Sequence, residues 1–66
     1  MEIRQGDKVK VTNPQFETMW ENRNVWIVDE VRRNVGSFPI LYACHNKYDS
    51  HNTTYHFKEH DVELIV

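Results

Sequence analysis

The fold is decided by residues 25–31, which read Val25-Trp26-Ile27-Val28-Asp29-Glu30-Val31. The run is rich in β-branched and aromatic side chains, which favour strands. Trp26 and Val28 alternate onto one face of such a strand, but strict alternation then places Val31 on the opposite face. A β-bulge at Asp29-Glu30 returns Val31 to the core side. The run therefore predicts a bulged, half-buried strand.

Shorter strands are predicted on both sides of this run. In residues 8–12, Val9 and Val11 alternate with polar side chains directly after the turn signal Gly6-Asp7. The same reasoning predicts strands at residues 40–44, 53–57 and 62–66, with turns at residues 32–37, 47–52 and 58–61.

Residues 13–24 form a connection that is too long for a tight hairpin. Pro14 suits the first position of a helix, and Asn13 before it suits the cap. We therefore expect a long first loop that carries one helical turn.

Five short strands without a long helical pattern predict an all-β domain, and a small five-stranded barrel is the arrangement that leaves no sheet edge exposed. At 66 residues the chain has room for one domain, residues 1–66, with a minimal core. The predicted core takes the apolar phase of each strand and comprises Val9, Val11, Val28, Val31, Tyr42, Phe57, Val62 and Leu64.

Two motifs resemble those of small bacterial SH3-like barrels. Gly6-Asp7-Lys8-Val9-Lys10-Val11 is similar to their G-D-x-V-x-V opening, and residues 57–64, Phe-Lys-Glu-His-Asp-Val-Glu-Leu, are similar to their F-x-E-x-D-L-E-L ending. The resemblance implies an SH3-like barrel with a one-turn helix before the last strand. The glycine that usually precedes the second strand is replaced by Glu21-Asn22-Arg23-Asn24. This departure weakens the link to the glycine-dependent KOW branch, which binds nucleic acid.

Composition argues against several classes of protein. Eight Lys and Arg against ten Asp and Glu give a net charge of −2, whereas sequence-independent nucleic-acid binders need clustered cations. The longest uncharged stretch is interrupted by Pro39, His45 and Asn46, so we expect no membrane span. The polar start of the chain does not resemble a signal peptide, and the single Cys44 cannot form an internal disulfide. We therefore expect a cytoplasmic location.

Cysteine and histidine are the residues that suggest chemistry. Cys44 and His45 are adjacent, so they point to opposite faces of a strand. His51, His56 and His60 do not add a paired-ligand spacing of the kind that zinc sites use. A cysteine that ends an apolar strand usually packs as a small hydrophobic group. We therefore expect no metal, no cofactor, no small-molecule substrate and no catalysis.

Aromatic residues in predicted loops indicate binding instead. Tryptophan, tyrosine and arginine dominate the energetics of protein interfaces. The expected protein-binding residues are Phe16, Met19, Trp20, Arg23, Phe38 and Tyr48. An equally weighted alternative is that Phe16 and Trp20 fold back as a lid over one end of the barrel.

The sequence thus favours a non-catalytic module that binds another protein. Its style resembles accessory or inhibitor proteins of phages and mobile elements. Two rivals stay open. One is a nucleic-acid-binding barrel that uses Arg23, Arg32 and Arg33 on phosphates, and the other is a small regulatory subunit of a larger assembly.

Overall fold

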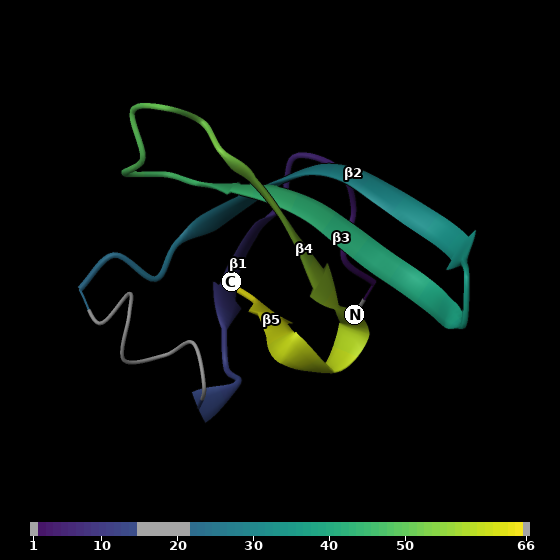
Figure 1. The fold of residues 1–66 in the computed structure, drawn as a ribbon. Helices are drawn as coiled ribbons and strands as arrows, with labels where there is room; N and C mark the ends of the chain where they lie inside the picture. The colour runs from purple at the N-terminus through teal and green to yellow at the C-terminus, as the bar shows by residue number, and fades with distance from the viewer. Residues whose placement is uncertain (1, 15–21, 66) are drawn as a thin grey trace.

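The computed structural model describes residues 2–14 and 22–65, and within them the chain is almost entirely β (Figure 1). The expected helical turn after Pro14 and the residues Phe16, Met19 and Trp20 fall outside the described residues, as does the choice between a binding face and a lid. The elements are β1 (Lys8–Val11), β2 (Trp26–Val35), β3 (Phe38–Asn46), β4 (Thr54–Lys58), the 3₁₀ turn η2 (Glu59–Asp61) and β5 (Val62–Leu64).

The strands form one antiparallel sheet in the order β4-β3-β2-β1-β5. Figure 1 shows the sheet curling, so that η2 carries the chain from one edge strand, β4, to the other, β5. In the described part of the chain, β4 and β5 do not pair with each other, so the barrel stays open between them. The predicted all-β class, the five strands, the long first connection and the 3₁₀ turn before the last strand are confirmed.

The predicted bulge in the second strand is confirmed. Val28 lies opposite Cys44, whereas Glu30 lies opposite Ala43, so Asp29 is the extra residue of β2. The shift places Val31 opposite Tyr42, on the core side of the sheet. Val31 is partly buried there and packs against the core.

The turn predicted at residues 32–37 is wrong over most of its length. β2 continues to Val35, which pairs with Phe38, so only Gly36 and Ser37 form the turn. Gly36 has a φ of +58°, which a glycine adopts without strain. Arg32, Arg33 and Asn34 resemble loop residues because they are polar, yet a solvent-exposed hairpin needs only backbone pairing and no burial.

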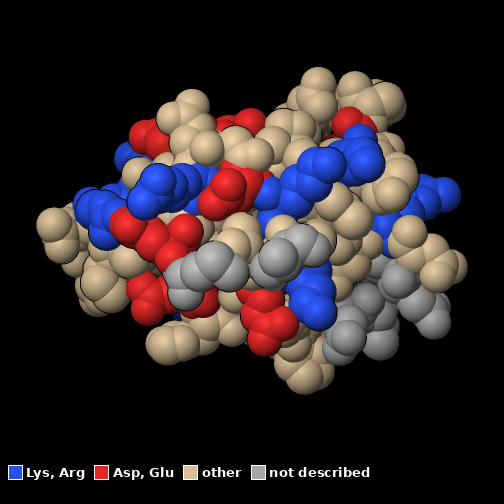
Figure 2. Space-filling view, turned by 180° about the vertical axis from the view of Figure 1, so that it is seen from behind, with Lys and Arg blue, Asp and Glu red and all other residues tan. Residues whose placement is uncertain are grey.

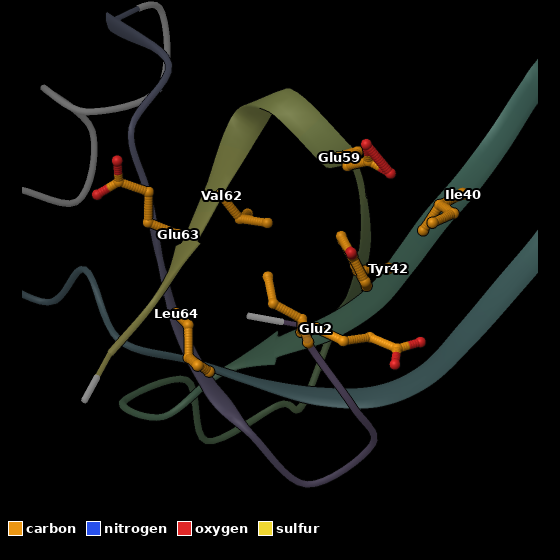
Figure 3. A pocket seen from close by; sticks show the side chains of 8 residues that line it. Glu2, Ile40, Tyr42, Glu59, Val62, Glu63 and Leu64 are labelled. Carbon is orange, nitrogen blue, oxygen red and sulfur yellow. The ribbon is translucent and has the colours of Figure 1, made fainter.

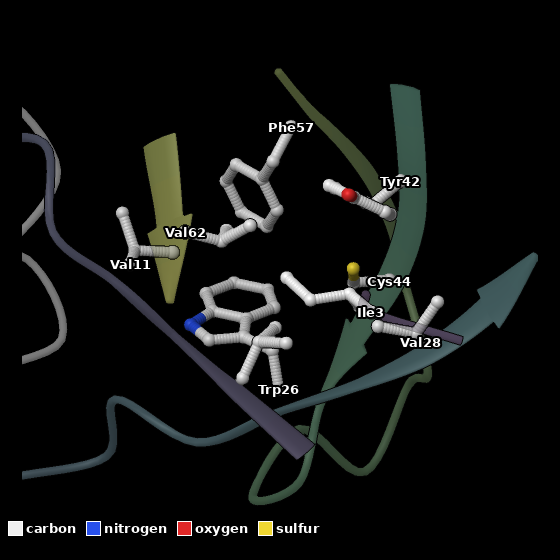
Figure 4. Close-up of a cluster of buried hydrophobic side chains, with 9 residues drawn as sticks. Ile3, Val11, Trp26, Val28, Tyr42, Cys44, Phe57 and Val62 are labelled. Carbon is white, nitrogen blue, oxygen red and sulfur yellow. The ribbon is translucent and has the colours of Figure 1, made fainter. Parts of the chain in front are cut away.

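The interior is centred on Trp26, which is completely buried (Figure 4). Its ring meets Phe57 at 4.9 Å and Tyr55 at 5.3 Å between centroids, in both cases edge to face. Six of the eight predicted core residues are buried, and Val31 and Leu64 are partly buried against them. The buried hydrophobic residues are Ile3, Val9, Val11, Trp26, Val28, Tyr42, Ala43, Cys44, Phe57 and Val62.

In the described residues there is no helix with the length and apolarity that crossing a membrane requires.

Candidate binding site

A pocket of about 430 Å³ lies where the long first loop enters β2 and where β3 runs into the loop before β4. We call it the tyrosine pocket. It brings together two predicted site residues, Arg23 and Tyr48, and adds Tyr55 from β4. Its lining comprises Arg23, Asn46, Tyr48, Asp49, Ser50, Thr53 and Tyr55.

Asn46, the last residue of β3, holds the walls of this pocket together. Its side chain is fully buried, although it is polar. Its amide nitrogen Nδ2 donates to the carbonyl oxygen of Arg23 at 2.7 Å, and its Oδ1 accepts from the backbone N–H of Tyr48 at 2.9 Å. One side chain therefore fixes two segments that are far apart in the sequence.

The loop between β3 and β4 is stabilised by its own aspartate. The carboxylate of Asp49 accepts backbone hydrogen bonds from His51 at 3.0 Å and from Thr53 at 3.2 Å. These bonds, the one from His51 first, lower the pKa of Asp49. Asn52 adopts a positive φ of 52°, which asparagine tolerates well. This wall of the pocket is thus a turn held in one conformation by its own hydrogen bonds.

The two tyrosines present aromatic surface to solvent. Tyr48 is 53% exposed and Tyr55 is 39% exposed. Tyr55 is held by its edge-to-face contact with Trp26, and the ammonium of Lys47 lies 5.8 Å from the centre of the Tyr48 ring. Large aromatic groups on a fixed frame lose little entropy when a partner binds. This arrangement suits a protein-binding surface.

A second asparagine closes the base of the first loop. Asn24 exchanges two hydrogen bonds with the backbone of Val11, accepting from its N–H at 2.8 Å and donating to its carbonyl at 2.7 Å. Its Oδ1 also accepts from the indole N–H of Trp26 at 3.1 Å. Asn24 therefore takes the place of a strand residue where β1 and β2 separate, and it anchors the chain directly after Arg23.

Phe38 does not share this pocket. It begins β3, at the opposite end of that strand from Asn46, and lines a separate hollow with Leu41 and Phe57. The ammonium of Lys58 lies 4.9 Å from the centre of the Phe38 ring. The structure thus brings Arg23 and Tyr48 together, separates Phe38 from them, and leaves Phe16, Met19 and Trp20 outside the described residues.

The cysteine and the histidines are distributed over different faces. Cys44 points into the core, whereas Nδ1 of His45 lies 2.8 Å from a carboxylate oxygen of Asp29, the bulge residue. In residues 2–14 and 22–65, His, Cys, Asp and Glu form no group of three or more that could hold a metal ion. Burial raises the pKa of the Cys44 thiol to about 12, and the negative charge of Asp29 adds to the effect.

Because its pKa is raised, the Cys44 thiol should be unreactive in the folded protein. A disulfide reagent at pH 8 is expected to label Cys44 only after denaturation. Below pH 9 the Cys44 thiol is protonated in both the folded and the unfolded protein. Above pH 9 it ionises in the unfolded chain but stays protonated in the folded protein. Stability contributed by this group is therefore lost as the pH rises from 9 towards 12, by up to about 1.4 kcal/mol per pH unit.

The check compares wild type with Cys44→Ala in urea denaturation at pH 8 and pH 10. The difference in unfolding free energy between the two proteins should shrink at the higher pH. Rapid labelling of the native protein, or a pH-independent difference, would contradict the buried position of the thiol.

Charge is interleaved on the surface. Figure 2 shows a face on which Lys and Arg side chains form a band with Asp and Glu side chains directly beside them. Arg33 pairs with Glu2 at 2.8 Å and Lys10 pairs with Glu63 at 3.7 Å. Such pairing lowers the positive potential that a phosphate backbone requires.

Comparison of the chain with protein-family models, with curated proteins and with solved structures found no match.

Proposed function

We propose that this chain is a non-catalytic protein-binding module built on an SH3-like barrel, and that it engages its partner through the tyrosine pocket. The observation that supports this proposal is the preorganised frame beneath Arg23, Tyr48 and Tyr55. Asn46 fixes the first two through their backbones, and Trp26 supports the third. Tyrosine and arginine are enriched among the side chains that dominate interface energies.

The roles of the two SH3-like motifs in this fold support the family assignment. In the opening motif, Gly6 has a φ of +91° and donates its N–H to the carbonyl of Val28 at 2.7 Å, while Val28 donates to the carbonyl of Asp7 at 3.0 Å. The positive φ of the glycine therefore allows the turn before β1 to form backbone hydrogen bonds with β2.

The closing motif connects a second pair of segments. Asp61 of η2 accepts a hydrogen bond from the side chain of Asn13 at 3.0 Å through Oδ1, and one from the backbone of Lys58 at 3.2 Å through Oδ2. Its carbonyl accepts from the N–H of Thr12 at 2.8 Å. The motif thus joins the end of β1 to the crossover between β4 and β5, and it contains the one-turn helix before the last strand that the family resemblance implies.

Nucleic-acid binding receives less support. Two of the described cations are occupied by glutamates, and the chain carries a net charge of −2. A complex with DNA or RNA would weaken steeply with salt, whereas a protein interface with aromatic anchors would change little.

Replacing Tyr48 with alanine is expected to weaken partner capture about 30-fold or more, the effect of losing a strong interface side chain. The partner is first identified by cross-linking and mass spectrometry in the source cell, and its affinity is then measured by titration calorimetry. Tyr48 is mostly exposed, so the fold should be retained in circular dichroism.

The matched control is Phe38→Ala, which removes an exposed aromatic group from a different hollow and should leave the affinity almost unchanged. Equal effects of the two substitutions would place the interface elsewhere. Tight oligonucleotide binding that disappears at high salt would favour the nucleic-acid alternative.

A further inference from the structure

A second hollow, of about 460 Å³, lies between the start of β3, the turn η2 and β5 (Figure 3). Its floor is apolar and its rim carries carboxylates. The residues that line this groove are Glu2, Ile3, Ile40, Tyr42, Glu59, Val62, Glu63 and Leu64. The volume falls within the range of about 300–1,000 Å³ that ligand-binding pockets occupy. We call it the acidic groove.

The apolar surface of the groove is continuous with the core. Figure 3 shows Tyr42 of β3 and Val62 of β5 facing each other across it. Both belong to the core, and Ile40 and Leu64 are partly buried beside it. An apolar side chain from a partner could therefore extend the core outward and would be removed from water at this point.

The Tyr42 side of the groove is negatively charged. Glu59 and Glu2 lie on this side in Figure 3, while the carboxylate of Glu63 turns away on the other. The pKa of Tyr42 is raised, first by burial and next by the negative charge of Glu59, whereas Arg33 lowers it by more than Glu2 raises it. The negative charge of Glu59 therefore acts on the floor of the groove, whereas that of Glu2 is offset by Arg33.

The charges in the groove are unequally compensated. Arg33 pairs with Glu2 and Lys10 pairs with Glu63, and the side chains in both pairs are more than half exposed. Exposed pairs of this kind contribute only about 0–1 kcal/mol, so an incoming cation can compete with them. Glu59 forms no ion pair with any described residue, so a ligand cation can approach it without displacing a described partner.

We propose that the acidic groove docks a basic segment of a partner protein, with one aliphatic side chain on the apolar floor and a flanking lysine or arginine against Glu59. An apolar floor alone would not select among partners, whereas the carboxylates favour cations and repel acidic segments. The tyrosine pocket lies at the Asn46 end of β3 and the acidic groove at its Ile40 end, so the two sites are independent.

The probe is a short capped peptide with one leucine flanked by lysines, titrated at low salt and followed by backbone amide shifts in NMR. Shifts are expected around Ile40, Tyr42 and Leu64. Replacing the lysines by glutamine, or the leucine by serine, should weaken binding, and replacing the lysines by glutamate should abolish it.

Glu59→Gln should lower the affinity for the lysine peptide about three- to tenfold, because it removes one close charge without changing shape. The matched control is Glu30→Gln, an exposed glutamate of β2 outside the groove, which should change the affinity less than about twofold. Tyr48→Ala should also leave this binding within about twofold, which separates the groove from the proposed function of the tyrosine pocket.

Three results would overturn the proposal. Equal losses for Glu59→Gln and Glu30→Gln would show only a general charge effect. Peptide-induced shifts confined to the tyrosine pocket would place the basic segment there. Groove residues that shift on dilution of the protein alone would show that a second copy of the chain occupies the groove.

Discussion

Trp26→Ala is expected to lower the free energy of unfolding by about 3–5 kcal/mol, which is the range for truncating a buried tryptophan. Trp26 is completely buried and contacts the rings of both Tyr55 and Phe57. Alanine would leave a large cavity in the middle of a minimal core, and it would remove the indole hydrogen bond to Asn24. Because a domain of this size has a small total stability, the variant should be largely unfolded at 37 °C.

Thermal and urea denaturation followed by far-UV circular dichroism provide the measurement. Trp26→Phe keeps most of the ring volume but loses the indole N–H, so it should fall between wild type and Trp26→Ala. The control is Tyr48→Ala, which removes an aromatic side chain that is 53% exposed and should cost little stability. Similar losses for Trp26→Ala and Tyr48→Ala would show that Trp26 is not the centre of the core.

Asn46→Ala should lower the free energy of unfolding by roughly 2–4 kcal/mol, because two backbone groups lose their partner in a partly buried place. The carbonyl of Arg23 and the N–H of Tyr48 both bind this one side chain. The substitution should also loosen the tyrosine pocket, so it should weaken partner capture although Asn46 is buried beneath the pocket surface.

Asn46→Asp tests the polarity of the site. The carboxylate could still accept from Tyr48, but it would face the carbonyl oxygen of Arg23 without a proton to donate. Its pKa in the folded state should therefore rise, and the variant should be more stable at pH 4 than at pH 7 relative to wild type. Asn22→Ala, at an exposed position near the same loop, is the control and should have almost no effect on urea denaturation. If Asn46→Ala leaves the free energy of unfolding unchanged, Asn46 does not hold the two segments together.

Much of the sheet could be predicted from the sequence because its signals are local. Alternation in Lys8–Val11 and the interrupted alternation around Asp29 predicted a strand and a bulge that the structure contains. In the missed part of β2, Arg32 to Asn34 are exposed and polar, so no hydrophobic pattern distinguishes them from a loop. Only its pairing with β3 makes it a strand.

The site was harder to predict because its residues meet through pairing between distant segments. Arg23, Tyr48 and Tyr55 share a pocket since Asn46 lies at the end of β3, opposite Trp26. From the sequence alone, an asparagine at the end of an apolar run is expected to be a turn residue. Only the folded structure shows that Asn46 is buried and hydrogen-bonded to both segments. The predicted grouping of Phe38 with Tyr48 treated loop aromatics as one face, although Phe38 begins β3 and Tyr48 lies in the turn after the other end of that strand.

The sequence by itself determined the all-β class, the bulge at Asp29, the turn glycines and most of the core, because each depends on the backbone preferences and alternation of a few neighbouring residues. The tertiary structure decided which residues from distant parts of the sequence lie side by side. Glu2 and Glu59 border one groove although they are far apart in the sequence, because η2 carries the chain across the open end of the sheet towards the N-terminal segment. Contacts of this range depend on strand register and sheet curvature, which are set by the packing of the whole core around Trp26 and by no short stretch of sequence.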